Sequence, residues 1–202
     1  MPGAVDVWFE FASTYSYPAV MRVEALAEQA GVRLVWRPFL LGPIFAAQGW
    51  RDSPFNIYPA KGRYMWRDLE RTCARLGLAF RRPTDFPRNG LLAARVATAA
   101  AGSVWLPAFV RDVYRANFVD DRDIAQPAVI ASVLGALGLD PEPWLREASS
   151  DAVKQRLRAA TEEATALGIF GAPTLRVGEE LFWGNERIPH VRKLLEAERR
   201  GG

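Results

Sequence analysis

The stretch that decides the fold is Val5-Asp6-Val7-Trp8-Phe9-Glu10-Phe11-Ala12-Ser13-Thr14-Tyr15-Ser16. Residues 5–11 alternate apolar and acidic side chains, a pattern typical of a half-buried strand. Residues 18–30 then place apolar side chains at helical spacing, and Pro18 suits a first helical turn, where a missing N–H is no loss. Ser13 and Ser16 therefore lie in a short link before a helix N-terminus, whose free N–H groups and dipole favour an anion or a thiolate.

The length and composition of the chain are those of an ordinary globular protein. With 202 residues, the chain can bury a substantial core without a metal or a disulfide. Half of the residues are hydrophobic and 24% are charged, which argues against disorder outside the Arg-Gly-rich tail. We therefore expect one domain, or one domain that carries a large insertion.

The charge pattern does not indicate a nucleic-acid-binding protein. The net charge is only +3, and Lys and Arg alternate with Asp and Glu along the chain. A sequence pI near 9.3 gives modest support to anionic small-molecule ligands. No apolar run approaches the roughly 20 residues that span a bilayer, and the N-terminus lacks the features of a signal peptide. We therefore expect a cytoplasmic protein without a membrane segment.

The chain has one cysteine, Cys73, and one histidine, His190. An internal disulfide is therefore impossible, and a Cys/His metal cluster, which needs about four ligands, is excluded. A Ser-His-Asp triad would have to use His190, which follows Pro189 where the last helix is predicted to begin. A structural histidine explains that position more simply.

The predicted elements fall into three blocks. The first is a βαβ unit, the second is all helical, and the third is a ββα unit. The order is a strand at 5–11, a helix at 18–30, a strand at 32–36, irregular chain at 40–59, helices at 61–76, 90–101, 105–118, 125–137 and 141–167, a hairpin of strands 174–177 and 181–183, and a helix at 187–198.

A βαβ unit and a ββα unit that share one sheet form a thioredoxin-like fold, and helices inserted between them resemble the DsbA-type thioredoxin family. Two hydroxyl side chains then occupy the place of that family's active-site thiols. Three motifs in order resemble the kappa-class glutathione transferases and the 2-hydroxychromene-2-carboxylate isomerases: Phe9-Glu10-Phe11-Ala12-Ser13-Thr14-Tyr15-Ser16-Tyr17, Tyr58-Pro59-Ala60-Lys61-Gly62-Arg63-Tyr64, and Gly168-Ile169-Phe170-Gly171-Ala172-Pro173-Thr174 followed by Leu181-Phe182-Trp183-Gly184-Asn185-Glu186-Arg187.

The resemblance covers essentially the whole chain and implies an α/β protein. We expect a thioredoxin-like fold with a large all-helical insertion domain. Residues 1–41 and 168–202 would form the two halves of the thioredoxin-like domain, and residues 42–167 the inserted helical domain.

Ser13 matches the serine of the family whose hydroxyl donates a hydrogen bond to the sulfur of glutathione. A serine cannot form a disulfide, but its hydroxyl can stabilise the thiolate of another molecule. Lowering a thiol pKa by roughly 2 units from its usual value near 8.5 takes about 2.7 kcal/mol, within reach of one charge-assisted hydrogen bond and a helix dipole. The alternative is that Ser13 only caps the helix. Ser16 is interpreted as a cap or first-turn residue.

Pro173 matches the cis-proline that faces the active loop in this family. That geometry would leave the backbone of Ala172 to pair with the peptide backbone of glutathione as a short added strand. The alternative is an ordinary proline at a strand edge. The resemblance further implies that four residues at the end of the hairpin hold the γ-glutamyl end of glutathione, although Asn185 also suits a helix N-cap: Trp183, Gly184, Asn185 and Glu186.

Candidate substrate-binding residues follow the second predicted strand. Lys61 suits a carboxylate of glutathione or of the substrate, and Asn56 suits either molecule; the alternative for Lys61 is a solvated lysine at a helix start. Asn89 is a further candidate, or a cap of the next helix. Phe45 occupies the position nearest to a lysine that contacts the substrate carboxylate in relatives, so the substrate pocket departs from the family pattern.

The resemblance implies a glutathione-dependent isomerase that acts on a small aromatic ketoacid, with glutathione as a recycled cofactor. A kappa-like glutathione transferase is the second hypothesis, and a non-catalytic thioredoxin-like binding or chaperone module is the third. A thiol-disulfide oxidoreductase is disfavoured because Cys73 has no partner cysteine. Relatives suggest a homodimer.

Overall fold

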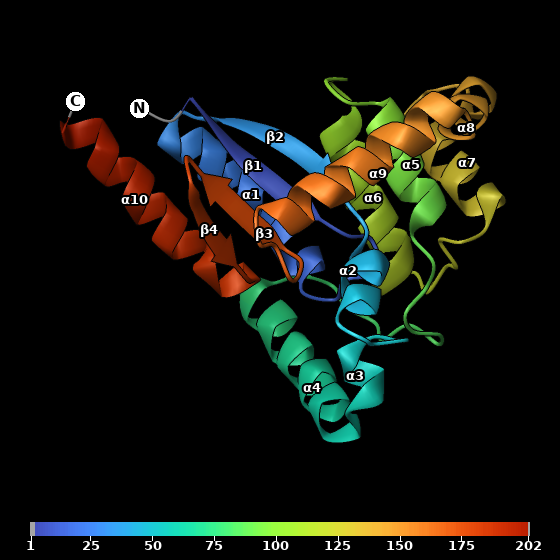
Figure 1. The fold of residues 1–202 in the computed structure, drawn as a ribbon, viewed down its shortest axis with the longest axis horizontal. Helices are drawn as coiled ribbons and strands as arrows, with labels where there is room; N and C mark the ends of the chain where they lie inside the picture. Colours follow the sequence, from blue (N-terminus) through green and yellow to red (C-terminus); the bar gives the residue numbers. More distant parts are fainter. Residues whose placement is uncertain (1–2, 202) are drawn as a thin grey trace.

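The computed structural model describes residues 3–201, which form a mixed four-stranded sheet surrounded by helices (Figure 1). The strands lie in the order β2-β1-β3-β4, with β1 parallel to β2 and antiparallel to β3, and β3 antiparallel to β4. The predicted βαβ and ββα units therefore share one sheet, and the predicted α/β class is confirmed. The strands are β1 (Ala4–Phe9), β2 (Arg33–Pro38), β3 (Thr174–Val177) and β4 (Glu180–Trp183).

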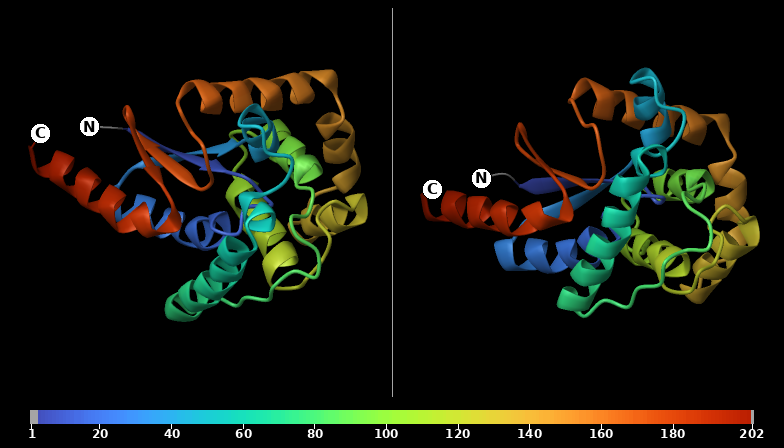
Figure 2. Two further views of the ribbon diagram at one scale, coloured as in Figure 1. Left: turned by 60° about the horizontal axis from the view of Figure 1, so that its bottom comes forward. Right: turned by 90° about the horizontal axis from the view of Figure 1, so that it is seen from below.

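Helices cover both faces of this sheet. α1 (Ser16–Ala30) and α10 (Ile188–Gly201) lie together on one face, and α9 (Asp151–Ala166) crosses the other near β2 (Figure 2). The alternation in β1 explains the arrangement, because neighbouring side chains of a strand point to opposite faces. Val5 and Val7 pack with α1 and α10, whereas Trp8 packs with Ala164 of α9.

The acidic residue within β1 is paired with arginines of both neighbouring strands. The carboxylate of Asp6 lies 3.2 Å from Nε of Arg37 on β2 and 3.7 Å from Nη1 of Arg176 on β3. Asp6 has the same parity as Trp8, so this cluster lies on the α9 face of the sheet. The alternation of acidic and apolar residues in β1 therefore corresponds to an ion-paired face and an apolar face.

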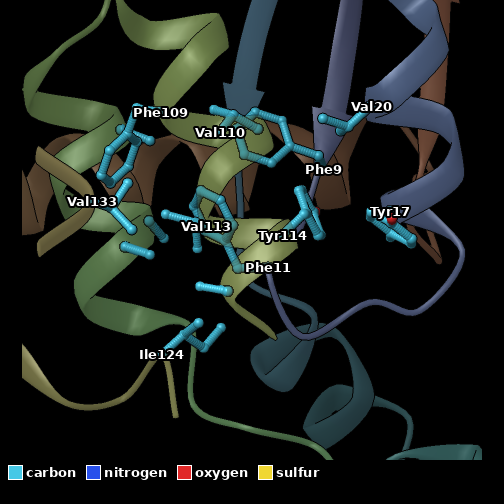
Figure 3. Packing of buried hydrophobic residues seen from close by; sticks show 14 of the residues in the cluster. Phe9, Phe11, Tyr17, Val20, Phe109, Val110, Val113, Tyr114, Ile124 and Val133 are labelled. Carbon is cyan, nitrogen blue, oxygen red and sulfur yellow. The ribbon is translucent and has the colours of Figure 1, made fainter. Parts of the chain in front are cut away.

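Along the chain, the remaining helices of this block follow β2 and precede α9. Their core is continuous with the end of β1, because Phe11 contacts both Phe109 and Tyr114 of α6, at centroid separations of 6.3 and 5.3 Å (Figure 3). Sheet and helical block thus share one buried cluster. The helices are α2 (Leu41–Ala47), α3 (Pro54–Ile57), α4 (Pro59–Leu76), α5 (Leu91–Ala99), α6 (Leu106–Phe118), α7 (Pro127–Ala136) and α8 (Pro141–Ala148), and a short 3₁₀ helix, η1 (Asn185–Arg187), precedes α10.

The structure corrects the prediction at three places. The segment 40–59, expected to be irregular, contains α2 and α3. The single helix predicted over 141–167 is two helices, because the Ser150 hydroxyl accepts the Val153 N–H at 3.2 Å and starts α9. β1 ends at Phe9 rather than at residue 11, and α1 begins at Ser16 rather than at residue 18. The division into 1–41 plus 168–202 and an inserted 42–167 stays a prediction.

Candidate active site

A cavity of about 1050 Å³ opens beside the carboxyl end of β1. Its wall combines the β1–α1 link, α2, the start of α4, the segment before α5 and the segment before β3. Most of the lining is apolar and includes several aromatic rings, a composition that suits an aromatic small molecule. The predicted site residues that line it are Ser13, Phe45, Lys61, Asn89, Ala172 and Trp183.

The Ser13 hydroxyl makes two hydrogen bonds, one of which joins the β1–α1 link to the segment before β3. Its hydroxyl donates to the backbone carbonyl of Ala172 at 2.8 Å and accepts the N–H of Ser16 at 3.3 Å. The second bond reaches the N–H of the first residue of α1, but the N-cap of α1 is Tyr15 and no side chain caps it, so the prediction that Ser13 is the N-cap is wrong. Ser13 is also one of the residues that line the cavity.

The Ala172–Pro173 peptide bond is cis, as the resemblance implies. The carbonyl of Pro173 accepts the N–H of Gly184 at 2.9 Å, so this segment is fixed to the end of the hairpin. The carbonyl of Ala172 accepts the Ser13 hydroxyl, whereas no acceptor for the Ala172 N–H is found among residues 3–201. A donor without a protein partner at a cavity wall fits the backbone of a peptide ligand.

Trp183 is the residue of the hairpin end that lines the cavity. It is 48% exposed, and its ring lies edge-on to Phe170 with centroids 4.9 Å apart. Gly171 permits this position, because a Cβ there would lie 2.5 Å from the indole Nε1. Trp183 and Phe170 therefore form an aromatic pair next to Ala172.

Pro173, Gly184, Asn185 and Glu186 do not line the cavity. The Asn185 side chain is 3% exposed, and its Oδ1 accepts a hydrogen bond from Nη1 of Arg22 on α1 at 2.9 Å. The N-cap interpretation of Asn185 is wrong, because Gly184 precedes the first residue of η1 and no side chain caps it. In this structure the Asn185 side chain thus connects η1 to α1.

Three of the four predicted substrate residues line the cavity. The Phe45 ring packs against Trp50 with centroids 5.6 Å apart, and Nζ of Lys61 lies 5.6 Å from the ring centroid of Phe55. Asn89 Oδ1 accepts the N–H of Leu91, the first residue of α5, at 2.9 Å, but the N-cap of α5 is Gly90 rather than Asn89.

Asn56 is not part of the cavity wall. Its amide donates to the Asp52 carboxylate at 3.1 Å and to the carbonyl of Phe86 at 3.2 Å. The side chain thus holds α3 against the segment before α5, both of which contribute to the cavity wall.

Two titratable groups of the wall were not singled out from the sequence. Burial raises the pKa of Glu10 from 4.5 to about 7, against the lowering effect of the Ala12 N–H, which donates to its carboxylate at 3.0 Å. Burial and the neighbouring Asp68 carboxylate, which accepts the Tyr15 hydroxyl at 3.0 Å, raise the pKa of Tyr15 well above its usual value. Tyr15 therefore stays a neutral phenol near pH 7.

The raised pKa of Glu10 predicts a pH-dependent stability. Because the folded state binds the proton more tightly, the free energy of unfolding is expected to fall as the pH rises from about 4.5 to about 7. Glu10→Gln keeps the group neutral and should be more stable than the native chain by about 3 kcal/mol at pH 8. Urea denaturation at pH 4, 6 and 8 measures the difference. The exposed Glu179→Gln variant is the control and should keep the pH dependence of the native chain. If the free energy of unfolding depends equally on pH in Glu10→Gln and in the native chain, the prediction is contradicted.

Cys73 lies in α4 away from the cavity wall. It is buried, and burial raises the pKa of its thiol to about 11, so the group is a neutral thiol at pH 7. The described part of the chain contains no group of three or more His, Cys, Asp or Glu side chains that could bind a metal ion. No helix within residues 3–201 is long and apolar enough to cross a bilayer.

A family model matches almost the whole of the described chain. The DsbA-like thioredoxin domain matches residues 4–196. The chain belongs to this family.

Relatives of this DsbA-like chain span its whole length. A 2-hydroxychromene-2-carboxylate isomerase of Sphingobium xenophagum is 29% identical over 199 residues, which cover 96% of this chain and 99% of the relative. Glutathione S-transferase kappa 2 of Caenorhabditis elegans is 26% identical over 211 residues, with 95% and 91% covered. A solved 2-hydroxychromene-2-carboxylate isomerase superimposes with a TM-score of 0.89 at 25% identity, with 98% and 97% covered.

These comparisons confirm the predicted thioredoxin-like DsbA fold and the resemblance to both enzyme groups. The sequence reasoning did not single out Glu10, Tyr15 and Phe170, which line this DsbA-like site. All three stand inside the motifs that carry the resemblance, and Glu10 directly follows the last residue of β1. A carboxyl that directly follows a buried strand and precedes a loop serine was the available signal.

Proposed function

We propose that this chain is a glutathione-dependent isomerase of 2-hydroxychromene-2-carboxylate or a related unsaturated aromatic ketoacid. The observation that carries the proposal is the position of the Ser13 hydroxyl, 2.8 Å from the Ala172 carbonyl and on the wall of a largely aromatic cavity. Its relatives at 26–29% identity include three isomerases of that name. The glutathione role is supported by the kappa-class relatives.

The residues present fit glutathione by their donor set. The Ala172 N–H and the Ser13 hydroxyl are donors on adjacent segments, and Trp183 covers the neighbouring part of the wall. Glutathione held by these donors would supply a thiolate nucleophile for reversible addition to the unsaturated bond of the substrate. When glutathione binds, the Ser13 hydroxyl would turn from the Ala172 carbonyl to the sulfur, where its hydrogen bond favours the ionised thiol, and the N-terminus of α1 adds its dipole.

The aromatic wall would bind the ring of the substrate. Phe45, Trp50 and Phe55 shield that part of the cavity from water, and Lys61 is the cation that we assign to a carboxylate. Phe45 in place of the lysine expected from the resemblance leaves Lys61 of α4 to make this contact. Asn89 would orient a polar substituent from the segment before α5.

Calorimetric titration with glutathione tests the first half of the proposal. We expect one site for each chain, and S-methylglutathione should bind more weakly because its sulfur cannot ionise. The second half is tested by adding o-hydroxybenzylidenepyruvate and following interconversion with its cyclic isomer. Absence of glutathione binding would refute the proposal. Binding without isomerisation would refute the substrate.

A kappa-like glutathione transferase is the second candidate, favoured by the relatives of that class. It uses the same Ser13 and Ala172 but releases the conjugate, so glutathione is consumed in proportion to product. Quantifying free thiol during turnover separates the two reactions. A constant thiol concentration supports the isomerase, and a falling one supports the transferase.

A further inference from the structure

Glu10 is an acidic group of the cavity wall that the proposed mechanism does not use. It directly follows β1 and stands three residues before Ser13, and both residues line the cavity. A single turn fixes the position of Glu10 relative to Ser13. The Ser13 N–H donates to the backbone carbonyl of Glu10 at 3.0 Å, and the Ala12 N–H donates to the Glu10 carboxylate at 3.0 Å. The carboxyl and the serine hydroxyl are thus held by the same short link.

The segment before α5 closes the other side of the carboxyl. A Cβ at Gly90 would lie 3.5 Å from Oε1 of Glu10 and only 2.8 Å from Cβ of Phe11, so the backbone approaches closely there. Gly90 also lines the cavity. The Glu10 carboxyl therefore lies in a narrow space between the link, the start of α5 and the cavity.

No cation within residues 3–201 lies at ion-pair distance from Glu10. Tyr114 of α6 donates its hydroxyl to the Glu10 backbone carbonyl at 2.7 Å, and the guanidinium of Arg88 is paired with Asp121. Lys61 of α4 lies over Phe55. Burial without a counter-charge is the reason that the pKa of Glu10 rises to about 7. The other titratable groups of the wall are Tyr15, Arg51, Asp52 and Tyr64.

We propose that Glu10 shares one proton with the thiol of bound glutathione and delivers that proton to the substrate during isomerisation, an inference that rests on the proposed function. Ser13 stabilises the sulfur anion by a hydrogen bond but has no means to accept the proton that leaves it. Two acidic groups held next to each other in one cavity share a single proton near neutral pH, because their like charges disfavour double ionisation.

The proton balance closes without another reactant. On binding, the S–H bond breaks and an O–H bond forms on Glu10. As the C–S bond forms, the electron pair of the substrate double bond moves towards the carbonyl, the O–H bond of Glu10 breaks and the α-carbon gains the proton. After rotation Glu10 removes that proton, the double bond re-forms and the C–S bond breaks, which restores the thiolate and the protonated carboxyl.

The test measures protons released on glutathione binding at pH 8, from calorimetric titrations in two buffers of different ionisation enthalpy. The native chain should release almost none, because Glu10 takes the proton. Glu10→Gln should release about three-quarters of a proton for each glutathione, since a thiol with a pKa near 8.5 is about three-quarters protonated at pH 8. Equal release from both chains would overturn the proposal.

Three comparisons keep the proposal testable. Glu10→Gln should lower kcat roughly tenfold or more with little change in glutathione affinity. Glu10→Asp keeps a carboxyl and should retain part of the native kcat. The exposed Glu179→Gln should have the kcat of the native chain. If Glu10→Gln does not fold, the Glu10 carboxyl of the native chain can be titrated by carbon NMR instead. Its apparent pKa should shift more with glutathione than with S-methylglutathione. Identical titration curves with the two ligands would refute the proposal. Failure of the native chain to bind glutathione would refute the proposed function itself.

Discussion

Ser13→Ala is expected to lower the isomerisation rate at pH 7 by about 10- to 100-fold. The hydroxyl is the side-chain donor that joins the link after β1 to the Ala172 carbonyl, and we assign it to the thiolate when glutathione is bound. A hydrogen bond to a charged group contributes about 1.5–3 kcal/mol, which sets the size of the effect. Glutathione should bind with less than about a tenfold loss, because the peptide part still pairs with the backbone of Ala172.

Steady-state kinetics and the pH at which bound glutathione ionises, followed by thiolate absorbance, measure this effect. The thiol should ionise at a higher pH in Ser13→Ala than in the native chain. Ser16→Ala is the matched control, since its side chain is buried and its backbone N–H still donates to Ser13. A turnover unchanged in Ser13→Ala would remove Ser13 from the mechanism.

Phe11→Ala is expected to destabilise the fold by about 3–5 kcal/mol, the cost typical of removing a fully buried aromatic ring. Its ring contacts Phe9 at 5.3 Å, Phe109 at 6.3 Å and Tyr114 at 5.3 Å between centroids (Figure 3). These contacts come from β1 and from α6, so the cavity left behind would disconnect the sheet from the helical block. The cost depends on how far the neighbouring rings can collapse into the space.

Urea denaturation of Phe11→Ala measures the free energy of unfolding. Phe170→Ala removes the same ring from a position that is 53% exposed, and it should change that free energy by no more than about 0.5 kcal/mol. Phe11→Leu, which keeps most of the buried volume, should lie between the two. Equal losses from Phe11→Ala and Phe170→Ala would show that the shared core does not stabilise the chain.

The part of the site that could be predicted lies in short motifs next to regular elements. Ser13 and the cis-proline Pro173 are placed by the strand, helix and hairpin patterns together with the family resemblance, and the structure joins them through Ala172. The N-cap prediction for Asn185 was wrong, because its side chain instead accepts a hydrogen bond from Arg22, far away in the sequence. Periodicity contains no information about such a partner.

The helical block shows the same limit. Segment 40–59 has too many Gly, Pro and aromatic residues for a helix pattern, yet α2 and α3 form there because they pack beside the cavity, and the Ser53 hydroxyl caps α3. Tertiary packing outweighs weak local preference in short helices. Tertiary contacts also explain why Asn56 lies outside the cavity wall, because its side chain contacts Phe86 of a distant segment.

Residue identity and local spacing already contain the βαβ and ββα units, the single cysteine, and the serine in the link after β1. These are local properties, set by side-chain alternation, helix spacing and residue identity. Only the tertiary structure decided which side chains face the cavity and how Glu10 is desolvated beside Ser13. The physical reason is that burial and pKa depend on segments far apart in the chain, here the end of β1, the start of α5 and the segment before β3, which meet only after folding.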